Sequence, residues 1–234
     1  MNRDLVLQAV KISTPVFFGY IAIGIPFGLM LISAGYPWWL APIMSILMFA
    51  GAGQYAAVGL FAVGADLTTI ALTMLAINIR HIVYGLSLIQ KMHGTGKWKY
   101  YIAYTLTDET YVLLTNCIIP RNAPVGPFFG TIAFLNHLYW IVGGLIGAVA
   151  GMLIPFSFEG VDFALTALFI VLLMDQLRTT KNPLPVIIGA VSAFLALFII
   201  GPGNMLIAAI AFGIMFLILL KKPVEKLQKE DNHD

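Results

Sequence analysis

Charged residues are scarce in this chain. Asp, Glu, Lys and Arg make up only 10% of its 234 residues, whereas 60% are hydrophobic. A soluble domain usually has about a quarter of its residues charged. The charges also lie mostly outside apolar runs of roughly 20 residues, the length of a membrane-spanning helix. These runs are continuous rather than alternating, which excludes the strands of a membrane barrel. The composition therefore predicts an all-α polytopic membrane protein.

Cysteine and the common catalytic motifs are also lacking. The single cysteine, Cys117, excludes an internal disulfide, and the net charge of +2 does not favour a nucleic-acid partner. The sequence contains no His-Glu-x-x-His, no Gly-x-Ser-x-Gly and no Walker phosphate loop. We expect no enzymatic activity, no cofactor and no metal site. Zinc held by His81, His137 and Asp108 is a weak alternative, because nothing in their spacing singles it out.

The apolar residues form eight segments separated by loops with glycine, proline or charge. The segments cover residues 14–34, 38–63, 66–89, 100–120, 127–154, 161–177, 183–200 and 203–220. This pattern predicts about eight transmembrane helices in one integral membrane domain of residues 1–234, with the last two helices forming a hairpin. The stretch 50–54, Ala-Gly-Ala-Gly-Gln, could instead break the second segment and make it re-entrant, which would leave seven spans.

The basic residues indicate the orientation. With eight spans and the N-terminus inside, the cytoplasmic side collects nine Lys and Arg residues and the outside collects Lys91, Lys97 and Lys99. Short cytoplasmic loops carry an excess of positive charge, so both termini are predicted to be cytoplasmic. The 91–99 loop disagrees with this assignment, and it would move inside if the second segment were re-entrant.

An internal repeat is a further hypothesis. A shift of 96 residues lays Asp66-Leu67 on Asp162-Phe163 and Gly51-Ala52 on Gly147-Ala148. Such a repeat would relate segments one to three to segments four to six, with one copy inverted, as in many secondary transporters. Chance matching of small and apolar residues is the alternative.

Two clusters of charged and polar residues lie inside the apolar segments. Arg80, with Asn78 and His81 beside it, lies well inside the third segment, and Asp108 and Glu109 lie about nine residues into the fourth. A charge at the bilayer centre costs at least about 2.5–3.5 kcal/mol, so these residues should face a partner or a polar cavity. Snorkelling of Arg80 to the interface and a structural Arg80–carboxylate ion pair are the alternatives.

Other polar residues inside the segments complete the candidate site. A histidine in a span can carry a proton, but more often it is hydrogen-bonded between helices. A pair near the end of the sixth segment, Asp175-Gln176, is more typical of a surface ion pair with Arg178. The remaining candidates are Ser45, Gln54, Asn136, His137 and Trp140.

Together these stretches resemble the AzlC family, the large subunit of branched-chain amino acid exporters. The matching stretches are GIPFG at 24–28, MS at 44–45, FAGAGQ at 49–54, INIRH at 77–81, YGLSL at 84–88, TDE at 107–109, NHLYW at 136–140 and DFAL at 162–165. The resemblance implies export of leucine, isoleucine, valine and related amino acids, with methionine as a further candidate. It also implies a bacterial cytoplasmic membrane and a second, small membrane subunit of the AzlD type.

The residues themselves suggest how such a substrate would be held. Arg80 suits the substrate carboxylate, and Asp108 or Glu109 suits the ammonium group or a coupling proton. Since no nucleotide-binding motif is present, we expect coupling to an ion gradient, most simply of protons. The glycines Gly143, Gly144, Gly147 and Gly151 are predicted to offer a helix-docking surface to the small subunit. A channel, or a permease subunit for another small solute, is the alternative function.

Overall fold

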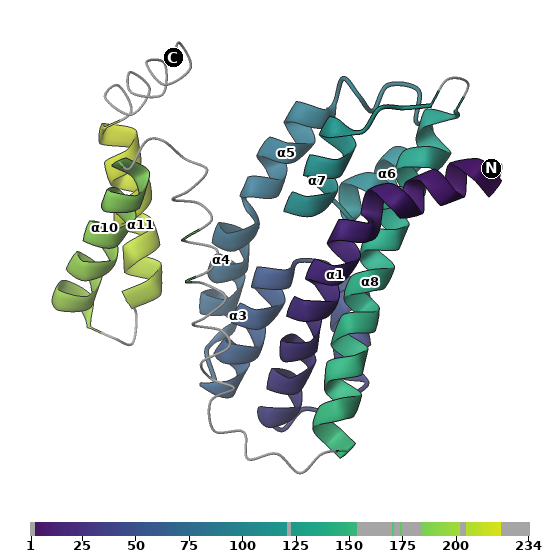
Figure 1. The fold of residues 1–234 in the computed structure, drawn as a ribbon. Helices are drawn as coiled ribbons and strands as arrows, with labels where there is room; N and C mark the ends of the chain where they lie inside the picture. The colour runs from purple at the N-terminus through teal and green to yellow at the C-terminus, as the bar shows by residue number, and fades with distance from the viewer. Residues whose placement is uncertain are drawn as a thin grey trace. The chain divides into compact units, whose positions relative to one another are not determined.

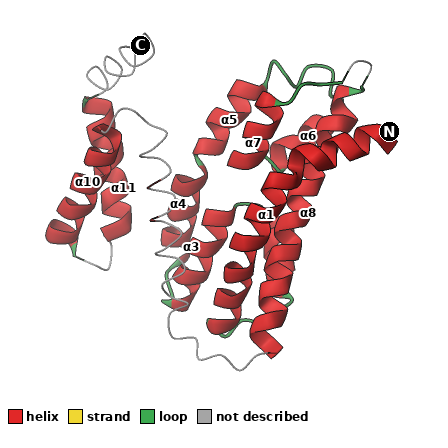
Figure 2. Cartoon of the chain, in the orientation of Figure 1, coloured by secondary structure: helices red, strands yellow, loops and turns green. Residues whose placement is uncertain are grey.

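Every element that the computed structural model describes is a helix, so the all-α prediction is confirmed (Figures 1 and 2). In a lipid environment a helix satisfies its own backbone hydrogen bonds, which explains why apolar runs of this length fold this way. The structure describes residues 3–120, 123–153, 170, 174, 184–201 and 205–220. They fall into two compact units, residues 1–65 with 77–164 and residues 66–76 with 165–234, and each unit is described by itself.

Two long helices form the centre of the first unit. Helix α1 (Arg3–Ser33) and helix α8 (Val125–Leu153) have 31 and 29 residues, long enough to cross a membrane. Gly24 packs on Gly143, and further along both helices Ile32 packs on Gly151. The two helices therefore run in the same direction, from the upper end to the lower end of the unit in Figure 1.

Glycines allow α1 and α8 to approach this closely. A Cβ added at Gly143 would lie 2.8 Å from the carbonyl oxygen of Tyr20, and one added at Gly24 would lie 3.0 Å from the Gly143 backbone. The surface of Gly143, Gly144, Gly147 and Gly151 was predicted to receive a partner subunit, and this prediction was wrong, because α1 of the same chain covers it. Small residues in membrane helices serve internal and external contacts alike, so the sequence could not tell the two apart.

The second apolar segment is a hairpin rather than a span. It consists of α2 (Leu40–Leu47) and α3 (Gly51–Ala62), with an interruption at residues 48–50. The start of α3 lies beside Trp140 near the middle of α8, and its end brings Phe61 to 6.1 Å from the ring of Tyr36, just after α1. Both ends of this lower hairpin therefore lie at the lower end of the unit, which agrees with the re-entrant alternative for this segment.

The fourth apolar segment is also a hairpin, and it comes from the opposite end. It consists of α6 (Trp98–Tyr104) and α7 (Asp108–Asn116), with an interruption at residues 105–107. Trp98 packs on Gly126 and Gly130 near the start of α8. At the other end of the hairpin, Lys91 donates hydrogen bonds to the carbonyl oxygens of Leu114 and Thr115 near the end of α7. Both ends of this upper hairpin lie at the upper end, so the prediction of a full span at 100–120 was wrong.

The third apolar segment crosses. Helix α4 (Leu67–Asn78) is followed by α5 (Arg80–Leu88), and the residue between them, Ile79, has helical dihedral angles (φ −57°, ψ −29°). Residues 67–88 are long and apolar enough to span a membrane, as are α1 and α8. Of the five predicted spans up to residue 153, four lie in the first unit as two long helices and two hairpins, and the fifth is the helix of residues 67–88, whose residues 67–76 belong to the second unit.

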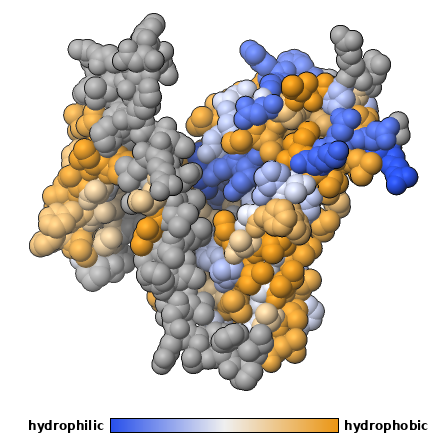
Figure 3. Space-filling view, viewed as in Figure 1, coloured by the Kyte–Doolittle hydropathy of each residue, from blue (hydrophilic) through white to orange (hydrophobic). Residues whose placement is uncertain are grey.

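In this arrangement the 89–97 loop lies at the same end of the first unit as the start of α1. Lys91 and Trp98 lie at the upper end, where α1 begins and where Ala9, Leu88, Leu114 and Phe128 share one apolar core. The prediction that Lys91, Lys97 and Lys99 lie opposite the N-terminus was wrong, because it counted the second segment as a full span. In Figure 3 hydrophilic residues gather over this upper end, around the start of α1.

In the second unit, α10 (Leu184–Ile200) packs against α11 (Met205–Leu219), as the predicted C-terminal hairpin requires. Gly201, at the end of α10, has φ +85°, a conformation that favours glycine. The start of α4 belongs to the same unit. There Asp66 accepts hydrogen bonds from the backbone N–H groups of Thr68 and Thr69 and so caps the helix.

The predicted 96-residue repeat is not reflected in the helix interruptions. The break at residues 48–50 would correspond to residues 144–146, which lie inside the continuous helix α8. The sixth segment, 161–177, lies outside the described residues apart from residues 170 and 174. The pairing of segments one to three with four to six stays a prediction.

Candidate functional site

The tips of the two hairpins meet near the middle of α8 and gather most of the polar residues that lie deep in the first unit. The upper tip, residues 105–107, carries the start of α7, and the lower tip, residues 48–50, carries the start of α3. Tyr104 near the upper tip donates a hydrogen bond to the carbonyl oxygen of Ile46 near the lower tip. The candidate site is therefore built where helices are interrupted, and such interruptions free backbone polar groups at membrane depth.

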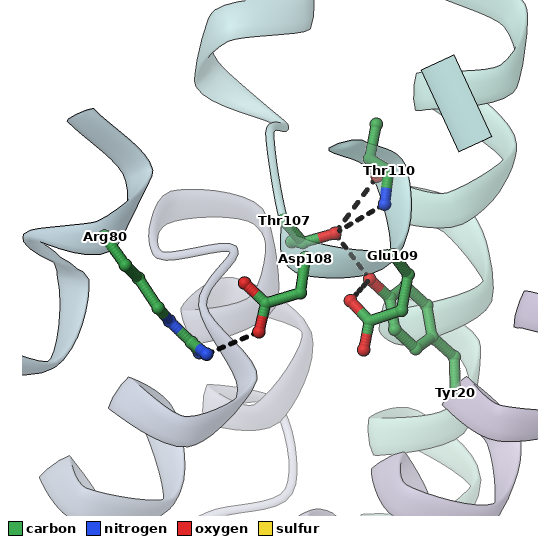
Figure 4. Close-up of polar contacts among 6 residues, drawn as sticks. All are labelled: Tyr20, Arg80, Thr107, Asp108, Glu109 and Thr110. Carbon is green, nitrogen blue, oxygen red and sulfur yellow. Dashed lines mark hydrogen bonds and ion pairs between the residues drawn. The ribbon is translucent and has the colours of Figure 1, made fainter. Parts of the chain in front are cut away.

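Arg80 and Asp108 form an ion pair at this depth (Figure 4). Each is the first residue of a helix, α5 and α7 respectively. Their side chains are 38% and 34% exposed, and one guanidinium nitrogen, Nη1, contacts one carboxylate oxygen, Oδ2. The Nε of Arg80 and the Oδ1 of Asp108 are buried and have no hydrogen-bond partner among the described residues. The pair therefore has a buried donor and a buried acceptor that it does not use for its own contact.

Glu109 points away from this pair, on the other side of the first turn of α7 (Figure 4). The hydroxyl of Tyr20 donates to Glu109 Oε2 at 2.7 Å and lies 2.7 Å from Thr107 Oγ1. The sequence suggested that Asp108 and Glu109 act as neighbouring carboxyls, but the structure gives each its own partner. Tyr20 is a site residue that sequence reasoning missed, because an aromatic residue in an apolar helix resembles a packing residue.

Thr107 explains why α7 starts where it does. Its backbone is extended (φ −103°, ψ 175°), and its Oγ1 accepts a hydrogen bond from the backbone N–H of Thr110, as an N-cap residue does. Asp108 and Glu109 follow in the first turn, where the helix dipole favours negative charge. The sequence Thr-Asp-Glu thus starts a helix inside the unit and holds two carboxylates at its end.

Ser45, Gln54 and Trp140 form a buried chain of hydrogen bonds at the lower tip. Gln54 Nε2 donates to Ser45 Oγ at 3.2 Å, and Trp140 Nε1 donates to Gln54 Oε1 at 2.6 Å. Trp140 also packs against Gly51, the first residue of α3. These three predicted site residues are brought together, and their hydrogen bonds tie the lower hairpin to α8.

His137 and Asn136 connect α8 to both hairpins. His137 Nε2 lies 3.0 Å from the carbonyl oxygen of Ser45, and its Nδ1 lies 3.1 Å from the hydroxyl of Tyr101. A neutral ring that donates to Ser45 and accepts from Tyr101 satisfies both contacts. Asn136 is fully buried and donates to Thr110 Oγ1 at 3.0 Å, while its Oδ1 has no hydrogen-bond partner among the described residues.

The remaining predicted residues lie around this centre. A Cβ added at Gly53 would lie 3.3 Å from Asn78 Nδ2, so the amide of Asn78 lies against the first turn of α3. The ring of His81 meets Tyr84 edge-on at 6.0 Å. Asp175 and Gln176 lie outside the described residues. In the part of the chain that the structure describes, no group of three His, Cys, Asp or Glu side chains could hold a metal ion.

Comparison with known proteins gives matches over most of the chain. The family model described as AzlC protein matches residues 15–154. An uncharacterized membrane protein of Helicobacter pylori is 34% identical over 94% of this chain and 98% of its own length. The branched-chain amino acid transport protein AzlC of Bacillus subtilis is 33% identical over 94% of this chain and 87% of its own. The inner membrane protein YgaZ of Escherichia coli is 29% identical over 75% of each chain. No solved structure matches.

Proposed function

The chain belongs to the AzlC family, and from this premise we propose that it is a secondary transporter that exports branched-chain and related apolar amino acids. The observation that carries the proposal is the Arg80–Asp108 ion pair at the meeting point of the hairpins. A charged pair so deep in an apolar protein is costly, and charges of this kind mark substrate or ion pathways.

The pair suits the two charges of an amino acid. A zwitterion brings a carboxylate, which accepts hydrogen bonds, and an ammonium group, which donates them. Arg80 has five N–H donors in a planar fork, of which Nη1 serves Asp108, and the buried Nε is available to the substrate carboxylate. Asp108 Oδ1 is correspondingly available to the substrate ammonium group.

The substrate side chain would be held by burial. An apolar pocket separates substrates that differ by one methylene by only about 1–3 kcal/mol. We therefore expect the chain to move leucine, isoleucine and valine with similar efficiency, and methionine as well. The name of the Bacillus subtilis relative supports the branched-chain class.

Glu109 is the better candidate for the coupling proton. It lies outside the ion pair and accepts a hydrogen bond from Tyr20, whose hydroxyl also contacts Thr107, so its proton can change without breaking the Arg80–Asp108 contact. A carboxyl that shares a hydrogen bond with another helix can couple protonation to helix movement, because the bond joins α7 to α1. Transport driven by the proton gradient is the simplest mechanism of this kind.

The remaining parts of the proposal concern the setting of the protein. We place it in a bacterial cytoplasmic membrane, with both termini in the cytoplasm and with a small membrane subunit of AzlD type as its partner. A permease subunit or channel for another small solute is the competing function. A channel would conduct without saturating, whereas a transporter saturates and exchanges its substrate.

Counterflow of labelled leucine in vesicles tests the function, with the chain alone and with the small subunit co-expressed. We expect saturable exchange that isoleucine and valine inhibit and that requires both subunits. Non-saturating uptake would support the channel, and absence of leucine exchange with both subunits present would refute the proposed substrate class. Full exchange by the purified chain alone would refute the need for a partner.

A further inference from the structure

The two hairpins enter the first unit from opposite ends. The lower hairpin has both its ends beside Tyr36, after α1, whereas the upper hairpin has both its ends beside Lys91 and Trp98. Each is short, because α2, α3, α6 and α7 have 8, 12, 7 and 9 residues. At about 1.5 Å per residue each arm covers roughly 10–18 Å, about half of the hydrocarbon core.

Each hairpin is followed by a crossing helix that runs in the opposite sense to the other. After the lower hairpin, residues 67–88 lead to the upper end, where Leu88 joins the core with Phe128. After the upper hairpin, α8 leads back to the lower end, where Gly151 meets Ile32. The order of hairpin and crossing helix is thus repeated upside down in residues 40–88 and 98–153. Inverted repeats of this kind place a transport site at their interface.

The hairpin tips meet through a few polar contacts at the candidate site. Tyr104 donates to the carbonyl oxygen of Ile46, and His137 joins the carbonyl oxygen of Ser45 to the hydroxyl of Tyr101. By contrast, apolar packing dominates the upper core around Ile102, Leu114 and Phe129. A few hydrogen bonds can be replaced by hydrogen bonds to water or substrate, whereas separating a packed apolar core exposes its whole surface. The hairpin tips can therefore move apart more readily than the upper core can.

We propose that the two hairpins are the two gates of one alternating-access site. The lower hairpin closes the Arg80–Asp108 site from the end where α1 finishes, and the upper hairpin closes it from the end where α1 begins. Movement of one hairpin tip at a time away from the other opens the site to one side only. This inference rests on the proposed transport function for its mechanism, whereas the re-entrant topology that it needs can be tested without any substrate.

The distribution of charge gives the orientation of the gates. Within the described part of the first unit, Arg3, Lys11, Lys91, Lys97 and Lys99 all belong to the upper end, and residues 28–65 and 145–153 contain no Lys or Arg. Cytoplasmic loops carry the excess of Lys and Arg, so the upper end is cytoplasmic. The upper hairpin is then the inner gate and the lower hairpin is the outer gate.

Two single cysteines in a Cys117→Ser chain test the topology. With re-entrant hairpins, Val63→Cys faces the outside and Lys97→Cys faces the cytoplasm, whereas two full spans would place them the other way round. Both residues are exposed, so a membrane-impermeant thiol reagent can reach them. We expect labelling of Val63→Cys alone in intact cells, and of Lys97→Cys only after the membrane is opened. The reverse pattern, or labelling of both in intact cells, would overturn the inference.

A cross-link between the tips tests the gating. Because Tyr104 reaches Ile46 through its whole ring, a direct disulfide would be too short, and a short bifunctional methanethiosulfonate reagent is preferable. In vesicles with the small subunit co-expressed, cross-linked Ile46→Cys/Tyr104→Cys should lose leucine exchange, and a reductant should restore it. The matched control is Tyr36→Cys/Phe61→Cys, which joins the segment between α1 and α2 to the end of α3, away from the hairpin tips, and should leave exchange unchanged.

The two experiments separate failure of the gates from failure of the proposed function. Normal exchange with the tips cross-linked would overturn the gating, even if leucine is the substrate. If the Cys117→Ser chain exchanges no leucine, the proposed function fails, and the labelling pattern of Val63→Cys and Lys97→Cys still decides whether the hairpins are re-entrant.

Discussion

Neutralising both members of the Arg80–Asp108 pair should separate its structural role from its functional role. Arg80→Gln leaves the Asp108 carboxylate without its partner, and Asp108→Asn leaves the guanidinium without its own. An unpaired ionised group in an apolar site costs several kcal/mol when fully buried. Because both side chains are about one third exposed, we expect a smaller loss of about 1–3 kcal/mol in the free energy of unfolding for each single variant.

The double variant Arg80→Gln/Asp108→Asn leaves no charge uncompensated. Its free energy of unfolding should return to within about 1 kcal/mol of the parent. Because the two single losses sum to about 2–6 kcal/mol, this corresponds to a coupling of about 1–6 kcal/mol in a double-mutant cycle. Export should nevertheless stay lost, because an amide pair offers no charge to either end of a zwitterion. Arg80→Lys should keep the stability and lose much of the export, since an ammonium lacks the planar fork.

The assay combines thermal unfolding of the purified protein in detergent with leucine efflux normalised to the amount of protein in the membrane. Recovery of efflux in the double variant would refute the substrate-binding role and leave a structural ion pair. Normal efflux by Arg80→Gln at normal expression would show that the guanidinium is not needed at all.

Three further predictions concern the surroundings of the site and the fold. Gly28→Ala should lower the free energy of unfolding by about 1–3 kcal/mol, because its Cβ would meet the α8 backbone. Gly19→Ala, whose Cβ would have nothing within 4 Å, should not lower it. Thermal unfolding of both variants tests this prediction. Glu109→Gln should make leucine efflux insensitive to an imposed pH gradient. Tyr20→Phe, which keeps the ring but loses the hydroxyl donor, should weaken the dependence of efflux on the pH gradient. An unchanged pH dependence in Glu109→Gln would exclude Glu109 as the proton carrier. Hydrogen bonds from the side chain and backbone of Thr69 lower the pKa of Asp66, so the stabilisation of the α4 N-terminus by this carboxylate is present at neutral pH and should be lost as pH falls below about 4. Asp66→Ala should remove this part of the acid dependence of unfolding.

The sequence predicted which segments are helical and enter the membrane better than it predicted whether each segment crosses or turns back. Apolar length identifies a segment that enters the membrane, but a hairpin of two short helices has the same length and composition as one span. For the second segment Gly51 and Gly53 gave a visible warning. In the fourth segment, the helix is interrupted at Thr107, which caps α7 by accepting a hydrogen bond from the backbone N–H of Thr110. Amino-acid composition does not reveal this contact. The charge bias of Lys91, Lys97 and Lys99 was a second signal that disagreed with full spans.

The sequence predicted the charged residues of the candidate site, but only part of their hydrogen bonds and ion pairs. Depth and rarity singled out Arg80 and Asp108, and an ion pair between them was among the alternatives. The separation of Glu109 from Asp108 depends on the helical turn, which directs adjacent residues to different sides of α7 (Figure 4). Tyr20 could not be found from sequence, because its partner lies 89 positions away and nothing in its own neighbourhood is polar.

The position of Arg80 argues against simple snorkelling to the membrane interface. It begins α5, and the nine residues to Leu88 span roughly 12 Å of helix before the loop at the upper end is reached. A snorkelling arginine would extend along α5 towards that loop, where Lys91 already lies. Instead its guanidinium contacts the first residue of α7, at the tip of the upper hairpin, and keeps Nε buried. The Arg80 guanidinium thus contacts a carboxylate at a helix interruption instead of the nearby membrane interface. At this position both a moving hairpin and a zwitterionic substrate would contact it.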